Sequence, residues 1–124
     1  MNRAEYDRKY NETHRFLIWA KGTVRRHVDN GYFVVVKVWQ LAELAERSDR
    51  CPYCGVELWC GPKNGMGSQP NSPTLDRVDN EDVVTSDNIE IVCHRCVSTK
   101  RDRTRAELVR YCQGVVARYA SHFS

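Results

Sequence analysis

The residues in this sequence with the clearest chemistry are four cysteines arranged as two Cys-x-x-Cys pairs. Cys51 and Cys54 lie in the turn-forming segment CPYCG, and Cys93 and Cys96 lie in CHRC. Structural zinc takes four tetrahedral ligands, and a two-residue spacer lets one tight turn present two thiolates to the same ion. The spacing therefore predicts a structural Zn²⁺ bound by all four sulfurs, with no position open for water. Redox-active or simply buried thiols are the alternative.

Two further cysteines lie outside these pairs. Cys112 falls on the apolar stripe of a helix predicted near the end of the chain, so we expect it to be a core residue. Cys60 is either an additional thiol or a ligand that competes with the pairs. The sequence alone leaves these two interpretations of Cys60 open.

The segment between the two pairs is acidic. Residues 76–90 contain six acids and one arginine. Residues 74–79 (TLDRVD) and 88–92 (NIEIV) are typical of two short strands with a connection that is polar at both ends, which predicts a hairpin. The second strand runs directly into Cys93. Because hard divalent cations prefer carboxylate oxygens, an acidic hairpin is a suitable place for one.

Several motifs in this region resemble the HNH endonuclease family, also called ββα-metal or His-Me finger nucleases. They are LDRVDN, the later SDNIEIVCHRC, and STK at 98–100, which follow a CPYCG turn as in small phage and bacterial members of that family. The resemblance covers about residues 37–112, including the tail from Asp102 to Cys112. It implies hydrolysis of phosphodiester bonds in DNA, and an association with phage-encoded nicking or DNA packaging.

The resemblance also implies roles for individual residues. Asp76 matches the aspartate that binds a catalytic Mg²⁺ or Mn²⁺, an ion that neutralises charge on the phosphate during cleavage. Asn88 matches the asparagine that ties the hairpin loop together and orients the general base. Lys100 matches a trailing lysine that contacts a phosphate.

Two positions depart from the family pattern. Arg77 stands where the family has the histidine base, and Val97 stands where it has a histidine or asparagine. An active variant would need other groups: His94 near the metal or a water, Asp79 as a second carboxylate, and Arg77 as a phosphate clamp. The alternatives are a nucleic-acid-binding module with weak or no cleavage, and an exposed Arg77–Asp79 ion pair without function.

The distribution of charge favours a polyanionic partner, although solvated helix faces would look the same. Seven Lys or Arg against three acids occupy residues 1–28, and six against two occupy residues 95–110. We expect contacts with the phosphates of duplex or branched DNA. The predicted contacts are Arg95, Lys100, Arg101, Arg103 and Arg105, supported by Arg15, Arg25 and Arg26. A zinc-ribbon adaptor or transcription-type DNA binder is the rival from another class.

The elements that position these residues follow from hydrophobic periodicity. It predicts a basic helix over 3–28, a strand over 32–36, a second helix over 38–45, and a loop over 61–73 before the hairpin. Thr104-x-x-Glu107 is a capping box that opens a last helix. Its predicted buried stripe is Leu108, Cys112, Val115, Val116 and Tyr119.

The length of 124 residues predicts a single α+β domain. Within 1–124 we expect a basic helix and short strand in 1–36, an HNH-like zinc finger module in 37–112, and a C-terminal helix in 103–120. The zinc-stapled ββα-metal finger is thus flanked by N-terminal and C-terminal helices. No apolar stretch suits a membrane span or signal peptide. The expected location is the cytoplasm of a bacterial or phage-infected host cell.

Overall fold

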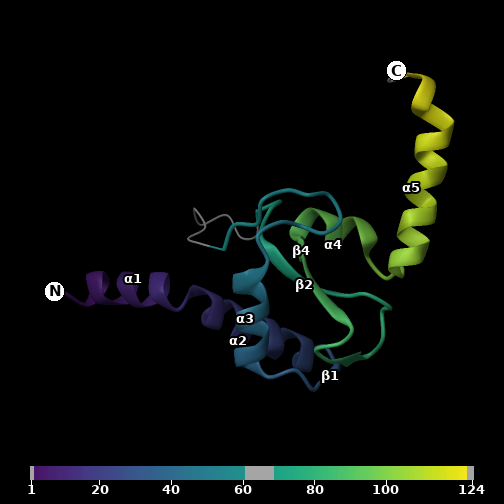
Figure 1. Cartoon of the computed structure of the whole chain (residues 1–124). Helices are drawn as coiled ribbons and strands as arrows, with labels where there is room; N and C mark the ends of the chain where they lie inside the picture. The colour runs from purple at the N-terminus through teal and green to yellow at the C-terminus, as the bar shows by residue number, and fades with distance from the viewer. Residues whose placement is uncertain (1, 61–68, 123–124) are drawn as a thin grey trace.

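The computed structural model describes residues 2–60 and 69–122 and combines five α-helices with two small sheets (Figure 1). This mixture agrees with the predicted α+β class. The helices are α1 (Arg3–Thr13), α2 (Arg15–Asp29), α3 (Val38–Arg47), α4 (His94–Lys100) and α5 (Arg105–Tyr119), followed by a 3-10 turn at Ala120–His122. The strands are β1 (Phe33–Val34), β2 (Pro73–Arg77), β3 (Val83–Val84) and β4 (Ile89–Cys93).

The N-terminal segment forms two helices where the sequence predicted one. His14 interrupts the helix with φ −110° and ψ 18°, and its backbone N–H still bonds to Tyr10 O. Helix α1 buries no residue and leaves Tyr6 and Tyr10 exposed, whereas α2 buries Ala20 and packs against α3. Since only α2 has an apolar partner, only α2 contributes to the core.

The main core lies where α2 and α3 meet the hairpin. Amphipathic α2 and α3 turn their apolar faces toward β2 and β4, which shields these side chains from water. The buried members of the cluster are Ala20, Val36, Leu41, Ala45, Leu75, Val84, Ile89 and Ile91.

The predicted hairpin is present as an antiparallel pair of β2 and β4. Pro73 pairs with Cys93 and Asp76 pairs with Glu90. Strand β4 leads without a gap into α4, so hairpin and helix form a ββα unit. The part of the predicted 61–73 loop at 61–68 lies outside the described residues.

A second pairing joins the two halves of the chain. Strand β1 runs parallel to β3, with Phe33 opposite Val83 and Val34 opposite Val84. Val35 and Val36 extend the contact, because the N–H of each donates to Val84 O. The hairpin connection is thereby held against the N-terminal segment.

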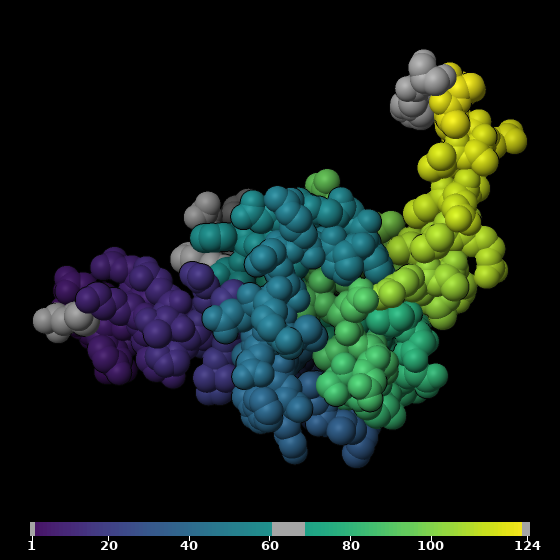
Figure 2. Space-filling model, in the orientation of Figure 1, coloured from purple at the N-terminus to yellow at the C-terminus, as the bar shows by residue number. Residues whose placement is uncertain are grey.

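Helix α5 begins as predicted, but its predicted buried stripe is wrong. The hydroxyl of Thr104 accepts a bond from Glu107 N, and Glu107 in turn accepts from Thr104 N, which completes the capping box. Only Leu108 is buried, because the helix projects away from the rest of the molecule (Figures 1 and 2). The other members of that stripe, Cys112, Val115, Val116 and Tyr119, are exposed.

Within the described residues, no helix is both long and apolar enough to traverse a bilayer.

Candidate metal centre and the adjoining hairpin

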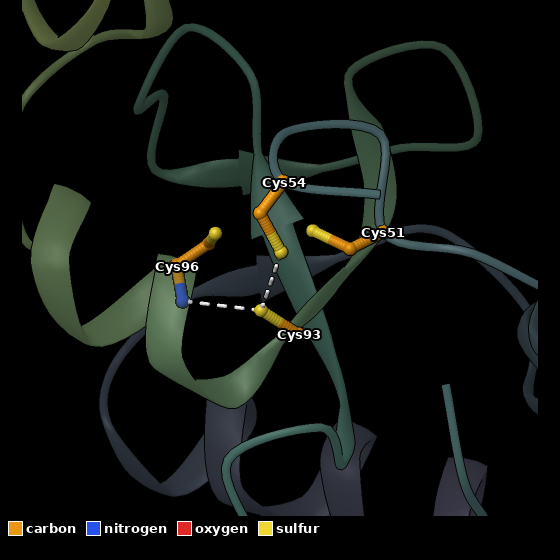
Figure 3. A group of neighbouring side chains, drawn as sticks. All are labelled: Cys51, Cys54, Cys93 and Cys96. Carbon is orange, nitrogen blue, oxygen red and sulfur yellow. Dashed lines mark hydrogen bonds between the residues drawn. The ribbon is translucent and has the colours of Figure 1, made fainter. Parts of the chain in front are cut away.

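The two cysteine pairs meet in space as one cluster. The sulfur atoms of Cys51, Cys54, Cys93 and Cys96 all lie within 4.8 Å of one another, and Figure 3 shows their side chains converging on a common point. Four thiols at such distances could hold a metal ion such as zinc. In the part of the chain that the structure describes, no other group of three or more His, Cys, Asp or Glu side chains comes together in this way.

Local backbone geometry presents these sulfurs. The first pair lies in a tight turn in which Gly55 N bonds to Cys51 O at 2.9 Å, and Gly55 has the positive φ of 79° that glycine adopts without strain. The second pair spans the start of α4. Cys93 is its N-cap, and the Cys93 sulfur accepts a bond from Cys96 N at 3.3 Å.

Ionisation of the thiols follows from burial and hydrogen bonding. Burial raises the pKa of Cys93 and of Cys96, and neighbouring thiols raise the pKa of Cys96 further. Burial also acts on Cys51, but bonds to its sulfur from the backbone at Cys93, Cys54 and Tyr53 prevail and lower its pKa to about 7. The soft, partly ionised donor set suits Zn²⁺, which binds thiolates in preference to thiols.

The remaining cysteines lie outside the cluster. The Cys60 sulfur lies 3.9 Å from the carbonyl oxygen of Arg15, so Cys60 does not compete for the ligand positions. Cys112 is exposed on α5 instead of lying in the core as predicted. The four cysteines that the spacing predicted as zinc ligands are therefore the four that the fold brings together.

Asp76 is buried beside this cluster with both oxygens engaged by protein groups. Its Oδ1 accepts a bond from Lys100 Nζ at 2.8 Å, and its Oδ2 accepts one from the Tyr53 hydroxyl at 2.6 Å. Lys100 Nζ also donates to the carbonyl oxygen of Arg77 at 2.7 Å. Asp76 is 6% exposed and Lys100 is 1% exposed. The expected phosphate contact of Lys100 is thus contradicted, because its ammonium is enclosed.

The side chains around Asp76 do not fit a divalent ion in this arrangement. Mg²⁺ and Mn²⁺ need several oxygen or nitrogen ligands, and the nearest cation position is filled by the Lys100 ammonium. Val97 packs against the cysteine cluster and offers no ligand atom. His94 is the first residue of α4, yet no group of metal-binding side chains among the described residues includes it or Asp76. Hydrolysis through such an ion would require a different arrangement of these side chains.

The Arg77 side chain is held in place by contacts with Tyr32 and Glu81. Its guanidinium carbon lies 4.0 Å from the centre of the Tyr32 ring, and Nη2 donates to the Tyr32 hydroxyl at 2.9 Å. Nη1 donates to Glu81 O at 2.5 Å. Asp79 is exposed and accepts a bond from Glu81 N at 3.4 Å. Among the described side chains Arg77 forms no ion pair with Asp79, so the predicted exposed pair is absent.

Asn88 holds the hairpin connection closed, as predicted. Its Oδ1 accepts a bond from Thr85 N at 2.9 Å, and its Nδ2 donates to Val83 O at 2.8 Å. Because these bonds span the turn before β4, Asn88 fixes the start of that strand.

Tyr53 is a site residue that sequence reasoning missed. Burial raises the pKa of Tyr53 to about 12, with the Asp76 carboxylate contributing in the same direction, so the hydroxyl stays protonated and donates to Asp76. Arg105 lies with its guanidinium carbon 5.4 Å from the Tyr53 ring centre and pairs with Glu90 at 2.5 Å. No spacing rule singles out the residue between two zinc-type cysteines, so the sequence held no signal for this role.

The arginines that were predicted to contact DNA differ in exposure and in whether other residues already bind their side chains. Arg95 and Arg101 are exposed on and just after α4. Arg103 donates to Thr99 O at 3.0 Å and stacks over Tyr111, and Arg105 is held by Glu90. In α2, Arg15, Arg25 and Arg26 are all exposed, although Arg25 lies 3.9 Å from Asp29 and Arg26 donates to Thr23.

No protein-family model, curated protein or solved structure matches this chain. The resemblance to HNH endonucleases therefore depends on the sequence motifs alone.

Proposed function

We propose that this chain is a zinc-stabilised nucleic-acid-binding domain with an HNH-like ββα unit, and that it binds the phosphates of duplex or branched DNA. The observation that carries the proposal is the exposure of Arg95 on α4 and of Arg101 directly after it. In the described structure neither side chain has an acidic partner. Exposed arginines without internal partners suit phosphate binding, since their donors are available to phosphate oxygens.

The backbone of Arg101 adds to this argument. Arg101 follows the last residue of α4 and has φ 55° and ψ −122°. Glycine adopts this backbone conformation readily, whereas residues with a Cβ rarely do. Such an outlier costs on the order of 1–3 kcal/mol and is concentrated at functional sites. An arginine in this position is therefore better explained by what its side chain binds than by what it contributes to folding.

Zinc has a structural role in this proposal. Four thiolates would complete a tetrahedral shell, so the ion would have no open position for water or substrate. It would join the CPYCG turn to the junction of β4 and α4, and so fix the helix that carries Arg95 and Arg101.

Binding is tested with a short fluorescein-labelled duplex titrated with zinc-loaded protein and followed by anisotropy. The double variant Arg95→Ala/Arg101→Ala should weaken binding, and the slope of log K against log salt should fall by about 1.8, or 0.9 for each lost phosphate contact. Arg47→Ala on α3 is the matched control, because Arg47 is also exposed but lies on another element. Equal affinity of the double variant and the control would reject this surface and favour a zinc-ribbon adaptor that binds protein.

Metal-dependent phosphodiester hydrolysis is the rival that the family resemblance implies, and it would require a divalent ion in the position that the Lys100 ammonium occupies. The observation that favours it is the placement of Asp76 on β2, facing α4 within the ββα unit, as the resemblance implies for a nuclease. A supercoiled-plasmid nicking assay with and without Mn²⁺ tests it. Cutting by the native chain that depends on Mn²⁺ and disappears in Asp76→Asn would establish the nuclease, whereas equal traces in both proteins would indicate contamination. A nuclease of this type would suit phage-associated nicking or DNA packaging.

A further inference from the structure

The ammonium of Lys100 lies in an oxygen-lined position inside the ββα unit. It is 2.8 Å from Asp76 Oδ1 and 2.7 Å from Arg77 O, and the side chain is 1% exposed. A carboxylate oxygen and a backbone carbonyl are also the ligands that hard divalent cations prefer. The lysine therefore satisfies the oxygens that a metal ion would otherwise use.

Charge balance explains why a second cation would be unfavourable there. The Asp76 carboxylate is matched by a single ammonium in an ion pair that is almost entirely buried. A divalent ion beside this pair would leave excess positive charge in a medium of low dielectric constant, where uncompensated charge is costly. Tyr53 already donates to the other carboxylate oxygen, so both oxygens of Asp76 have protein donors.

We propose that Lys100 is the built-in cation of the ββα unit, and that its ammonium keeps divalent ions away from Asp76. Asp76 is then the counter-ion that fixes α4 against the hairpin. This inference does not depend on the proposed binding of DNA, since it concerns only the cation at Asp76.

The first experiment measures bound Mn²⁺ by electron paramagnetic resonance in the zinc-loaded native chain, with Asp76→Asn as the control. We expect the native chain and the control to bind the same background amount of Mn²⁺. A site in the native chain that disappears in Asp76→Asn would overturn the proposal.

The second experiment removes the ammonium. Lys100→Ser should gain an Mn²⁺ site and a rise in melting temperature of about 5 °C at tenfold excess of Mn²⁺ over its Kd, while the native chain should show no rise. The double variant Asp76→Asn/Lys100→Ser should lose the response. If Lys100→Ser does not fold, Lys100→Gln keeps most of the volume and a donor without the charge, and the same gain is expected. A folded variant that lacks the ammonium and gains no Mn²⁺ site would also overturn the proposal.

Discussion

Loss of either partner of the buried ion pair between Lys100 and Asp76 should strongly reduce the stability of the folded chain. Replacing Lys100 by methionine keeps most of the length of the side chain and removes its charge. The carboxylate of Asp76, 6% exposed, would keep only the hydrogen bond from Tyr53. We expect the zinc-loaded protein to lose about 3–5 kcal/mol of unfolding free energy, the usual cost of leaving one buried charge without its partner.

The magnitude follows from the distance between the two charges. At 2.8 Å, and with an effective dielectric constant of about 20, the Coulomb attraction is about 332/(20 × 2.8), or about 6 kcal/mol. Desolvation of each ion costs several kcal/mol, so the net stabilisation by the intact pair is far smaller than the attraction. Removing one partner forfeits the attraction while the other ion remains desolvated, which accounts for the large expected loss.

A double-mutant cycle measured by urea unfolding separates this effect from lost packing. Asp76→Leu/Lys100→Met should be at least about 3 kcal/mol more stable than the sum of the single variants predicts, because no unpaired charge remains. Tryptophan fluorescence is a suitable probe, since Trp19 Nε1 donates to Pro73 O at the edge of the hairpin. Arg25→Met, which breaks the exposed pair with Asp29, is the control and should change stability by less than about 1 kcal/mol. Single variants that cost no more than this control, with no coupling, would refute a buried pair.

Three further outcomes are expected. Cys96→Ser, or chelation of zinc, should unfold the ββα unit cooperatively, as seen by circular dichroism, and a chelated chain that keeps its native spectrum would contradict a structural zinc role. Because burial raises the pKa of Cys93 and Cys96, both are protonated near neutral pH in the metal-free chain, so zinc binding releases at least two protons. Zinc affinity should therefore fall by at least about a hundredfold for each pH unit of acidification, which competition with a chromogenic chelator measures, and a flat profile would contradict thiolate ligation. Arg101→Gly should raise the unfolding free energy by about 1 kcal/mol while weakening DNA binding, and weaker binding without a gain in stability would contradict backbone strain.

Local patterns in the sequence were enough to predict the features that depend on near neighbours. The two cysteine pairs, the hairpin and the capping box at Thr104 each depend on residues a few positions apart, or on a strand alternation that needs no partner to be recognised. Asn88 belongs to the same class, since its bonds to Thr85 and Val83 stay within one connection. The resemblance predicted that this asparagine ties the loop together, and these two bonds do so.

Features that depend on distant partners were not predictable in the same way. Periodicity indicated that α5 is a helix with an apolar stripe, but it carries no information on whether another element covers that stripe. The parallel pairing of β1 with β3 joins residues that are far apart in the chain, and two-residue strands have too little pattern to reveal it. His14 likewise interrupts a helix whose periodicity continues on both sides.

The ion pair of Asp76 depends on a spacing that is present in the sequence but is recognised only once the start of α4 is known. Helix α4 begins directly after Cys93, so Val97 and Lys100 lie three residues apart on its inner face. The position that offers no metal ligand is thus followed, one turn later, by a lysine that reaches Asp76. The absence of a metal ligand at Val97 and the internal ammonium of Lys100 fit together, because a buried carboxylate needs a cation of some kind. The cysteine cluster and this ion pair then hold α4 at two points along the hairpin, at Cys93 and at Asp76.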